Sequence, residues 1–191
     1  CIVLKHKEED CKVVKDLKYS EELQYIVSHN TRNQFITRLC DKLKGNTLCL
    51  YQLVEKHGVG LYNAMKDFDR KVFFIHGGTD TETREQIREI TEKETNAIIV
   101  ASYGTFSTGI NIRNLHNVVF ASPSKSRIRV LQSIGRGLRR PNVGEVHTTL
   151  LDIADDFTHN DRKNFTLNHF LERINIYNEE EFDYEIDKVR L

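Results

Sequence analysis

The sequence has no excess of charge of either sign. Its 28 Lys and Arg residues balance 28 Asp and Glu residues, which argues against a strongly basic nucleic-acid-binding domain. Any binding to nucleic acid must therefore come from a local basic patch. Only two prolines occur among 191 residues, and contents of 39% apolar and 29% charged residues are ordinary for one or two soluble globular domains with a sizeable core.

Long hydrophobic runs and grouped cysteines are also missing. The longest apolar runs, 72–75 and 97–101, are far too short to span a bilayer, and no signal peptide is visible. We therefore expect no membrane partner. The four cysteines, at positions 1, 11, 40 and 49, form no CxxC pair, which disfavours zinc and disulfide frameworks. We expect free thiols in a reducing cytosol.

Two further absences concern metals and the start of the chain. The eight histidines show no HxxxH or HxH grouping, so the sequence predicts no metal site. The chain begins at Cys1 rather than at a methionine, and we expect it to be a piece of a longer protein.

Short apolar runs alternate with amphipathic segments along most of the chain. Helices are predicted from Ser28 or Asn30 to Leu43, over 59–66, from Asp80 or Thr81 onward, from Ser124 or Ser126 to Ser133, and over 161–178. Buried strands are predicted over 2–4, 47–51, 72–75, 97–101, 117–121 and 148–153. This alternation, without an internal repeat, indicates an α/β fold with a mostly parallel central sheet flanked by helices.

The two ends of the chain are less clearly patterned. The segment from the first strand to Tyr25 is charged and has little periodicity, and His57-Gly58 is assigned to a loop. We expect one domain over residues 1–178, followed by an acidic tail over 179–191 that is loosely held. The tail is either a partner-binding segment or simply solvated.

The most unusual stretch is Gln132-Ser133-Ile134-Gly135-Arg136-Gly137-Leu138-Arg139-Arg140. Glycines let the backbone approach a ligand closely, and arginines offer a planar fork of donors that suits phosphate oxygens. Arg136 and Arg139 are three residues apart, so they would share one side of a helical turn. The pair could close on a polyphosphate, although an isolated RxxR motif is more often a solvated turn.

Two other polar segments follow predicted strands. Residues 102–112 offer four Ser and Thr hydroxyls and two glycines with accessible amides, which are suitable donors to phosphate oxygens. Residues 75–79 read Ile-His-Gly-Gly-Thr and could present amides at the start of a helix. Either segment alone could be a polar turn. Because ligands of parallel sheets collect beyond the carboxyl ends of the strands, the three segments together suggest one site.

In this order, the segments resemble the second RecA-like domain of superfamily 2 helicases. Strand 47–51, the His-Gly-Gly loop, residues 102–112 and residues 132–139 correspond to motif IV, the HGG loop, motif V and motif VI. The QxxGRxxR and GTFSTG forms resemble the branch of DNA helicases and translocases rather than the DEAD-box RNA group. Within it, the chain is similar to bacteriophage recombination helicases, which implies the cytoplasm of an infected bacterial cell.

The resemblance implies a role for each matched position. Arg136 and Arg139 would be arginine fingers that reach the γ-phosphate of ATP across an interdomain cleft, with Gln132 linking motif VI to the nucleotide. Gly109 and Asn111 would lie near the nucleotide; many family members carry Asp at the latter position, which leaves a ribose contact open. The implied contacts to the backbone of the bound strand are Gly77, Gly78, Ser102 and Thr105.

The resemblance also implies partners and cofactors that this chain does not hold alone. No G-x-x-x-x-G-K-[ST] phosphate cradle and no DExH or DEAD sequence is present. The family keeps both in its first RecA-like domain, which mainly holds ATP and Mg²⁺. We therefore expect an upstream RecA-like domain in the same protein, and an isolated chain without ATPase or unwinding activity. The implied substrates are single-stranded and branched DNA, with RNA–DNA hybrids as a further candidate.

Two other classes of function fit parts of the pattern. A non-catalytic α/β module that binds nucleic acid or nucleotide is one alternative, although the neutral net charge disfavours strong binding by this chain alone. A Rossmann-type nucleotide domain is the other. It is disfavoured because no GxGxxG follows the first strand with an acidic residue about 20 positions later.

Overall fold

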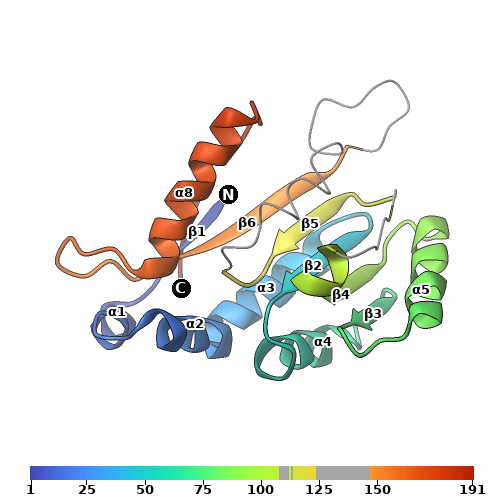
Figure 1. The fold of residues 1–191 in the computed structure, drawn as a ribbon, viewed down its shortest axis with the longest axis horizontal. Coiled ribbons are helices and arrows are strands. Elements are labelled where there is room, and N and C mark those ends of the chain that lie inside the picture. The colour runs from blue at the N-terminus through green and yellow to red at the C-terminus, as the bar shows by residue number, and fades with distance from the viewer. Residues whose placement is uncertain (108–111, 113, 124–146) are drawn as a thin grey trace.

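In the part of the chain that the structure describes, seven strands form one sheet in the order β3-β4-β2-β5-β6-β1-β7, and every pairing in it is parallel. The computed structural model describes residues 1–107, 112, 114–123 and 147–191 (Figure 1). The strands are β1 (Ile2–Lys5), β2 (Thr47–Tyr51), β3 (Val72–Ile75), β4 (Ile98–Ser102), β5 (Asn117–Phe120), β6 (Thr149–Asp156) and β7 (Asp187–Arg190). The expected α/β class with a mostly parallel sheet is confirmed.

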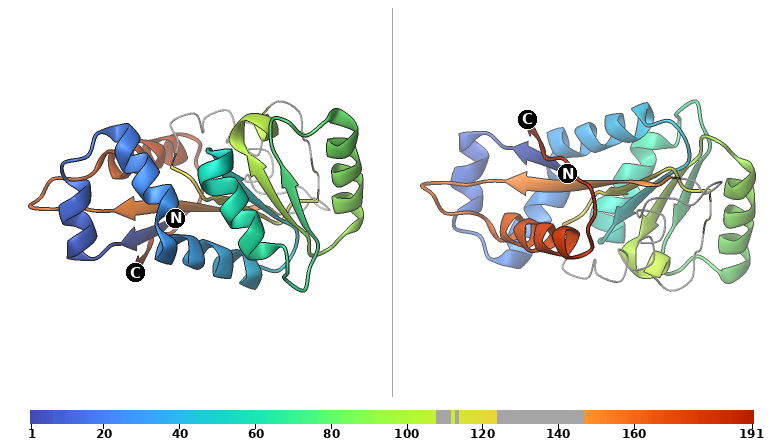
Figure 2. Two further views of the ribbon diagram at one scale, coloured as in Figure 1. Left: turned by 90° about the horizontal axis from the view of Figure 1, so that it is seen from below. Right: turned by 90° about the horizontal axis from the view of Figure 1, so that it is seen from above.

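Helices cover both faces of this sheet (Figure 2). They are α1 (Glu8–Val14), α2 (Tyr19–Ser28), α3 (Asn30–Lys42), the π-helical turn η1 (Val54–Gly58), α4 (Val59–Met65), α5 (Thr81–Lys93), α6 (Tyr103–Ser107) and α8 (Phe165–Glu179). Helices α3 and α4 pack on one face, and α5, α6 and α8 contribute to the core on the other. The described part of the chain is therefore a three-layer α/β/α domain.

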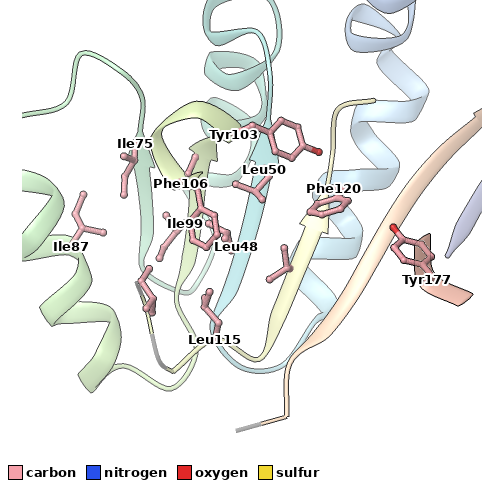
Figure 3. Packing of buried hydrophobic residues seen from close by; sticks show 13 residues of the cluster. Leu48, Leu50, Ile75, Ile87, Ile99, Tyr103, Phe106, Leu115, Phe120 and Tyr177 are labelled. Carbon is pink, nitrogen blue, oxygen red and sulfur yellow. The ribbon is translucent and has the colours of Figure 1, made fainter. Parts of the chain in front are cut away.

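Strand β2 shows how the sequence builds the two layers. Side chains alternate between the faces of a strand, so Leu48 and Leu50 enter the core beneath α5 and α6 (Figure 3). Cys49 and Tyr51 enter the core beneath α3 and α4. All five residues of the strand are buried, as expected for a central parallel strand covered by helices on both sides.

The turn before β2 is held by a glycine and a buried amide. Gly45 adopts φ +88°, and a Cβ there would meet Cγ of His116 at 2.5 Å. The buried Asn46 side chain donates to the carbonyl oxygens of Thr91, Glu94 and Asn114, and it accepts from the amide of Ala97. One side chain therefore joins the entry of β2 to the end of α5 and to the entries of β4 and β5.

Several boundaries differ from the sequence predictions. The poorly patterned segment forms α1 and α2, and α3 is capped by His29, whose Nδ1 accepts from the amide of Arg32, rather than by Ser28 or Asn30. His57-Gly58 belongs to the π-helical turn η1 instead of a loop. The last long helix begins at Phe165 rather than at residue 161, because Asn164 is extended and precedes it.

The expectation of a loosely held tail is wrong for residues 187–190. They form β7, whose Val189 pairs with Leu4 in a parallel ladder at the edge of the sheet. The sequence pattern did not indicate this strand, because it follows the acidic residues 179–185 and Val189 is the one apolar residue within it. The chain therefore adds a strand to its sheet after α8.

The sequence predicts free cysteines and no membrane-spanning segment. All four cysteines are free, as predicted. Over the described residues, no helix is both long enough and apolar enough to cross a membrane.

Candidate functional site

Four neighbouring strands end at one edge of the sheet. The ladders pair Ile75 with Ala101, Tyr51 with Ser102, and Leu50 with Phe120. The residues that follow β3, β4, β2 and β5 consequently emerge side by side at the carboxyl edge, where parallel sheets bind their ligands. Two of the three polar segments predicted from the sequence begin at this edge, after β3 and β4.

The His-Gly-Gly loop after β3 is a tight, self-bonded turn. The amide of His76 donates to Oγ1 of Thr79 at 3.1 Å, and the amide of Gly78 donates to Nδ1 of His76 at 3.1 Å. Asp80 then caps α5 through a 2.8 Å bond from the amide of Thr83. This hydrogen bond from the Thr83 amide is the main reason why the pKa of Asp80 lies below its usual range.

The backbone of this loop is accessible. Gly77 and Gly78 are exposed, and no atom lies within 4 Å of the position that a Cβ of Gly77 would take. The same is true of Gly104 in the neighbouring helix α6. Glycines with open space around them let a polymer backbone approach the main chain closely, which suits contacts that do not depend on base sequence.

Ser102 and Thr105 occupy a different environment. They are only 9% and 5% exposed, and their hydroxyl oxygens lie 2.7 Å apart in a mutual hydrogen bond. The amide of Thr105 also donates to Oγ of Ser102 at 3.3 Å. The two side chains therefore fix the first turn of α6 and set the position of the exposed Gly104.

A buried network connects α6 and the end of β5 with the elements on the opposite face. The hydroxyl of Tyr103 donates to the carbonyl of Ser122 at 2.9 Å, and Oγ of Ser122 accepts from the amide of Gln52 at 3.1 Å. Nδ1 of His57 lies 2.7 Å from that Oγ, and its Nε2 lies 3.1 Å from Oδ1 of Asn33. The network thus ties together the ends of β2 and β5, η1, α3 and α6.

Burial gives His57 an unusual pKa. Desolvation, with a smaller contribution from the positive charge of Arg32, lowers the pKa of His57 to about 3. The ring is therefore neutral, with Nδ1 accepting from the Ser122 hydroxyl and Nε2 donating to Asn33. Sequence reasoning missed this residue because His57, Ser122 and Asn33 have no motif spacing. Only the fold brings them together.

The remaining predicted site residues lie outside the described part of the chain. They are Gly109, Asn111, Gln132, Arg136 and Arg139. The predicted helix from Ser124 or Ser126 to Ser133 lies outside it as well. The structure therefore brings together Gly77, Gly78, Ser102 and Thr105, on two adjacent strand ends.

The carboxyl edge near α6 offers main-chain and hydroxyl groups rather than metal ligands. Within the described ranges, the one group with the spacing of metal ligands is His6, Asp10 and His29. These residues lie at and beyond the end of β1, four strands away from β4 in the sheet. The loops after β3 and β4 are thus suited to a phosphate-bearing ligand.

Comparison with protein families gives a match over most of the site. Residues 31–141 match the family described as helicase conserved C-terminal domain. The matched range includes β2 to β5, the His-Gly-Gly loop, α6 and the arginine-rich stretch.

Comparison with individual proteins extends the similarity to the whole chain. The chain is 36% identical to the ATP-dependent DNA helicase uvsW of Enterobacteria phage T4, over all of this chain and 40% of that protein. The crystal structure of T4 UvsW superimposes with a TM-score of 0.84 at 35% identity, covering 99% of this chain and 40% of the other. The chain thus spans about two fifths of the length of this relative.

A more distant structure shows the same fold. The C-terminal domain of the DEAD-box protein Dbp5 matches with a TM-score of 0.61 at 17% identity, covering 85% of this chain and 86% of that one. At this identity the similarity speaks only for the architecture, a RecA-like domain of the second type. The predicted resemblance to a bacteriophage DNA helicase and the predicted fold are both confirmed.

Proposed function

Because the chain belongs to the helicase conserved C-terminal domain family, we propose that it is the second motor domain of an ATP-dependent DNA helicase or translocase. Its substrates would be single-stranded and branched DNA, with R-loops and other RNA–DNA hybrids as further candidates. The work would belong to replication, recombination or repair in the cytoplasm of a phage-infected bacterium. The observation that carries the proposal is the 36% identity to a DNA helicase over the entire chain.

The proposed division of labour follows the edge of the sheet. Exposed Gly77 and Gly78 would contact the backbone of the bound strand, and the exposed Gly104 of α6, after the adjacent strand β4, would be a further contact. Ser102 and Thr105 lie in the region that touches the strand, and their mutual hydrogen bond would hold the first turn of α6 in place for that contact. Main-chain contacts of this kind bind any sequence, as a translocating motor requires.

The arginine-rich stretch, residues 132–140, would contact the nucleotide. We place Arg136 and Arg139 against the γ-phosphate, and Gln132, Gly109 and Asn111 near the rest of the nucleotide, by their correspondence with motifs V and VI. The phosphate cradle and the Mg²⁺ ligands would come mainly from an upstream RecA-like domain. An arginine supplied to a transferring phosphoryl group accelerates the reaction by roughly 10³–10⁵ where it has been measured.

The decisive experiment uses a protein in which the upstream domain is present. Nucleic-acid-stimulated ATP hydrolysis is compared for wild type, Arg139→Ala and Arg139→Lys, with Arg38→Ala on the exposed side of α3 as the matched control. We expect both Arg139 variants to lose about 10³-fold or more in turnover while retaining ATP binding, and the control to hydrolyse ATP normally. Unchanged turnover in Arg139→Ala would favour the non-catalytic binding module.

The isolated 191-residue chain provides a second test. Catalysis needs the phosphate cradle and the arginines together, so we expect the purified chain to hydrolyse no ATP, with or without DNA. ATPase activity of this chain that disappears in Arg136→Ala would contradict the proposed division between the two domains.

A further inference from the structure

Two histidines and an aspartate converge where β1 meets the first three helices. A ring nitrogen of His6, a carboxylate oxygen of Asp10 and a ring nitrogen of His29 all lie within 4.8 Å of one another. His6 follows β1, Asp10 lies on α1, and His29 joins α2 to α3. No motif in the sequence marks this group, because its members are separated by 4 and 19 positions and share no familiar spacing.

His6 is held in an orientation that is typical of a metal ligand. Its side chain is fully buried, and Nε2 lies 2.9 Å from Oδ1 of the equally buried Asp155. The same oxygen also accepts from Nε of Arg32 at 2.8 Å, in an ion pair whose two side chains are fully buried. The ionised carboxylate can only accept, so Nε2 of His6 carries the proton.

The other ring nitrogen of His6, Nδ1, is available to a cation when the ring carries its single proton on Nε2. Nδ1 is buried and makes no hydrogen bond in the structure. A buried acceptor that receives no hydrogen bond is costly. A carboxylate that fixes one nitrogen of a histidine, leaving the other for a cation, is the usual outer-shell arrangement of protein metal sites.

Asp10 and His29 supply the other two ligand atoms. Oδ1 of Asp10 accepts from the hydroxyl of Tyr25 at 2.6 Å, while Oδ2 lies 3.5 Å from Nε2 of His29. The two side chains are 23% and 14% exposed, so an ion can reach the site from solvent. The 3.5 Å separation is close to that of two ligands on one tetrahedral ion with bonds of about 2.0–2.2 Å.

We propose that His6 Nδ1, Asp10 and His29 Nε2 bind a Zn²⁺ ion. Two imidazoles and one carboxylate are ligands that zinc accepts readily, and a water would complete four-coordination. An ion on Nε2 of His29 leaves the ring proton on Nδ1, which gives up the 3.3 Å capping bond from the amide of Arg32. The ion would fasten the end of β1 to α1 and to the α2–α3 junction.

The competing explanation is a hydrogen-bonded aromatic cluster without an ion. The ring of Phe157 stacks on His6 with centroids 3.7 Å apart, and Tyr25 packs edge-on to both His29 and Phe157. These contacts account for the burial of the rings. They leave Nδ1 of His6 without a donor, and this is the atom that the ion would satisfy.

The test measures binding of Zn²⁺ and Co²⁺ to the purified chain by calorimetry and by absorption. The two informative variants are Asp10→Asn, whose Oδ1 can still accept from Tyr25, and His29→Asn, since asparagine is a favoured helix N-cap. Both remove a ligand while preserving a local bond, so both should fold. The matched controls are Glu9→Gln on α1, His159→Asn, which removes a histidine outside the cluster, and Cys1→Ser.

The proposal predicts one specific metal ion per chain. Wild type and all three controls should bind Zn²⁺, and Co²⁺ should give the visible bands of a four-coordinate site without a sulfur charge-transfer band. Asp10→Asn and His29→Asn should each weaken binding by at least about tenfold. Added Zn²⁺ should raise the melting temperature of wild type and of neither variant.

Three outcomes would overturn the proposal. The first is a wild-type chain that binds neither ion at micromolar concentration. The second is affinity in Asp10→Asn and His29→Asn equal to that of wild type, provided that circular dichroism shows both variants folded. The third is loss of binding in Cys1→Ser, which would assign the ion to the terminal amine and thiol instead.

Discussion

Arg173 of α8 holds Asp152 of β6 through two nearly parallel hydrogen bonds inside the protein. Nε of Arg173 donates to Oδ2 at 2.7 Å and Nη2 donates to Oδ1 at 2.9 Å, with both side chains almost fully buried. The hydroxyl of Tyr177 donates to the same Oδ2 at 2.6 Å. Although burial opposes it, the nearby Asp152 carboxylate raises the pKa of Arg173. This pair fixes α8 on the sheet between β6 and β7.

Replacing Arg173 by methionine should therefore destabilise the domain strongly. The variant leaves Asp152 charged, buried and held by Tyr177, and breaking a buried pair in this way costs about 3–5 kcal/mol. Urea denaturation followed by circular dichroism would measure the change in the free energy of unfolding.

The matched control for Arg173→Met is Arg88→Met on α5. Arg88 also pairs with two carboxylates, those of Glu85 and Glu92, but the cluster lies at the surface. Surface pairs contribute little because water screens them, so the control should unfold close to wild type. Equal losses in the two variants would mean that burial of the Arg173 pair does not matter.

Gly45 and Gly60 form a second matched pair. Gly45 has φ +88° and its Cβ position lies 2.5 Å from Cγ of His116, so Gly45→Ala should cost more than about 1 kcal/mol of stability. Gly60 lies in α4 with open space around it, so Gly60→Ala should stabilise the domain by roughly 0.5–1 kcal/mol. Chemical denaturation of both variants tests the opposite signs. A stable Gly45→Ala would contradict the strained turn.

The sequence predicted the elements whose local pattern agrees with their burial. Strands β2 and β3 were predicted to the residue, because apolar runs bounded by turns have few alternatives in an α/β fold. Ile90 shows the limit of this reasoning. It lies three residues after Ile87 on α5, where helical spacing favours burial, but it is exposed, while the polar Thr91 is buried. The last turn of α5 lies against Asn46, whose side chain donates to the carbonyl of Thr91.

Contacts between distant residues explain the other differences. β7 was missed because its pairing with β1 spans nearly the whole chain, and His29 was missed as a cap because histidine is not a preferred capping residue. At the carboxyl edge of the sheet, the sequence predicted that the His-Gly-Gly loop and the region of Ser102 and Thr105 contact the bound strand, and this remains a prediction. No sequence motif indicated that the hydroxyls of Ser102 and Thr105 bind each other or that His57 lies behind them.

Asn46 provides the next prediction. Its side-chain nitrogen faces the carbonyl oxygens of Thr91, Glu94 and Asn114. In Asn46→Asp, a carboxylate oxygen would face these three acceptors, so we expect a loss of about 3 kcal/mol or more. Asn63→Asp on the exposed side of α4 makes the same chemical change as a control and should alter stability little. Similar denaturation midpoints for the two variants would contradict the bridging role of Asn46.

The last prediction concerns the pH dependence that His57 imposes on the fold. Burial lowers its pKa to about 3 in the native state, whereas the unfolded chain takes up the proton near pH 6.5. The unfolded state therefore binds more protons between these values. The contribution of neutral His57 to the free energy of unfolding is therefore fully present above a pH of about 6.5. Below that pH it falls by up to about 1.4 kcal/mol per pH unit.

Comparison with His57→Gln isolates this contribution from that of other titrating groups. Glutamine keeps polar atoms near Ser122 and Asn33 but cannot titrate, so it should lower stability at neutral pH and remove one source of acid sensitivity. The free energy of unfolding of both proteins should be measured by urea denaturation from pH 7.5 to pH 4.5. The advantage of wild type over the variant should shrink as the pH falls. A constant difference would mean that His57 accepts a proton within the fold as readily as in the unfolded chain, and that the Ser122–His57–Asn33 network does not require a neutral ring.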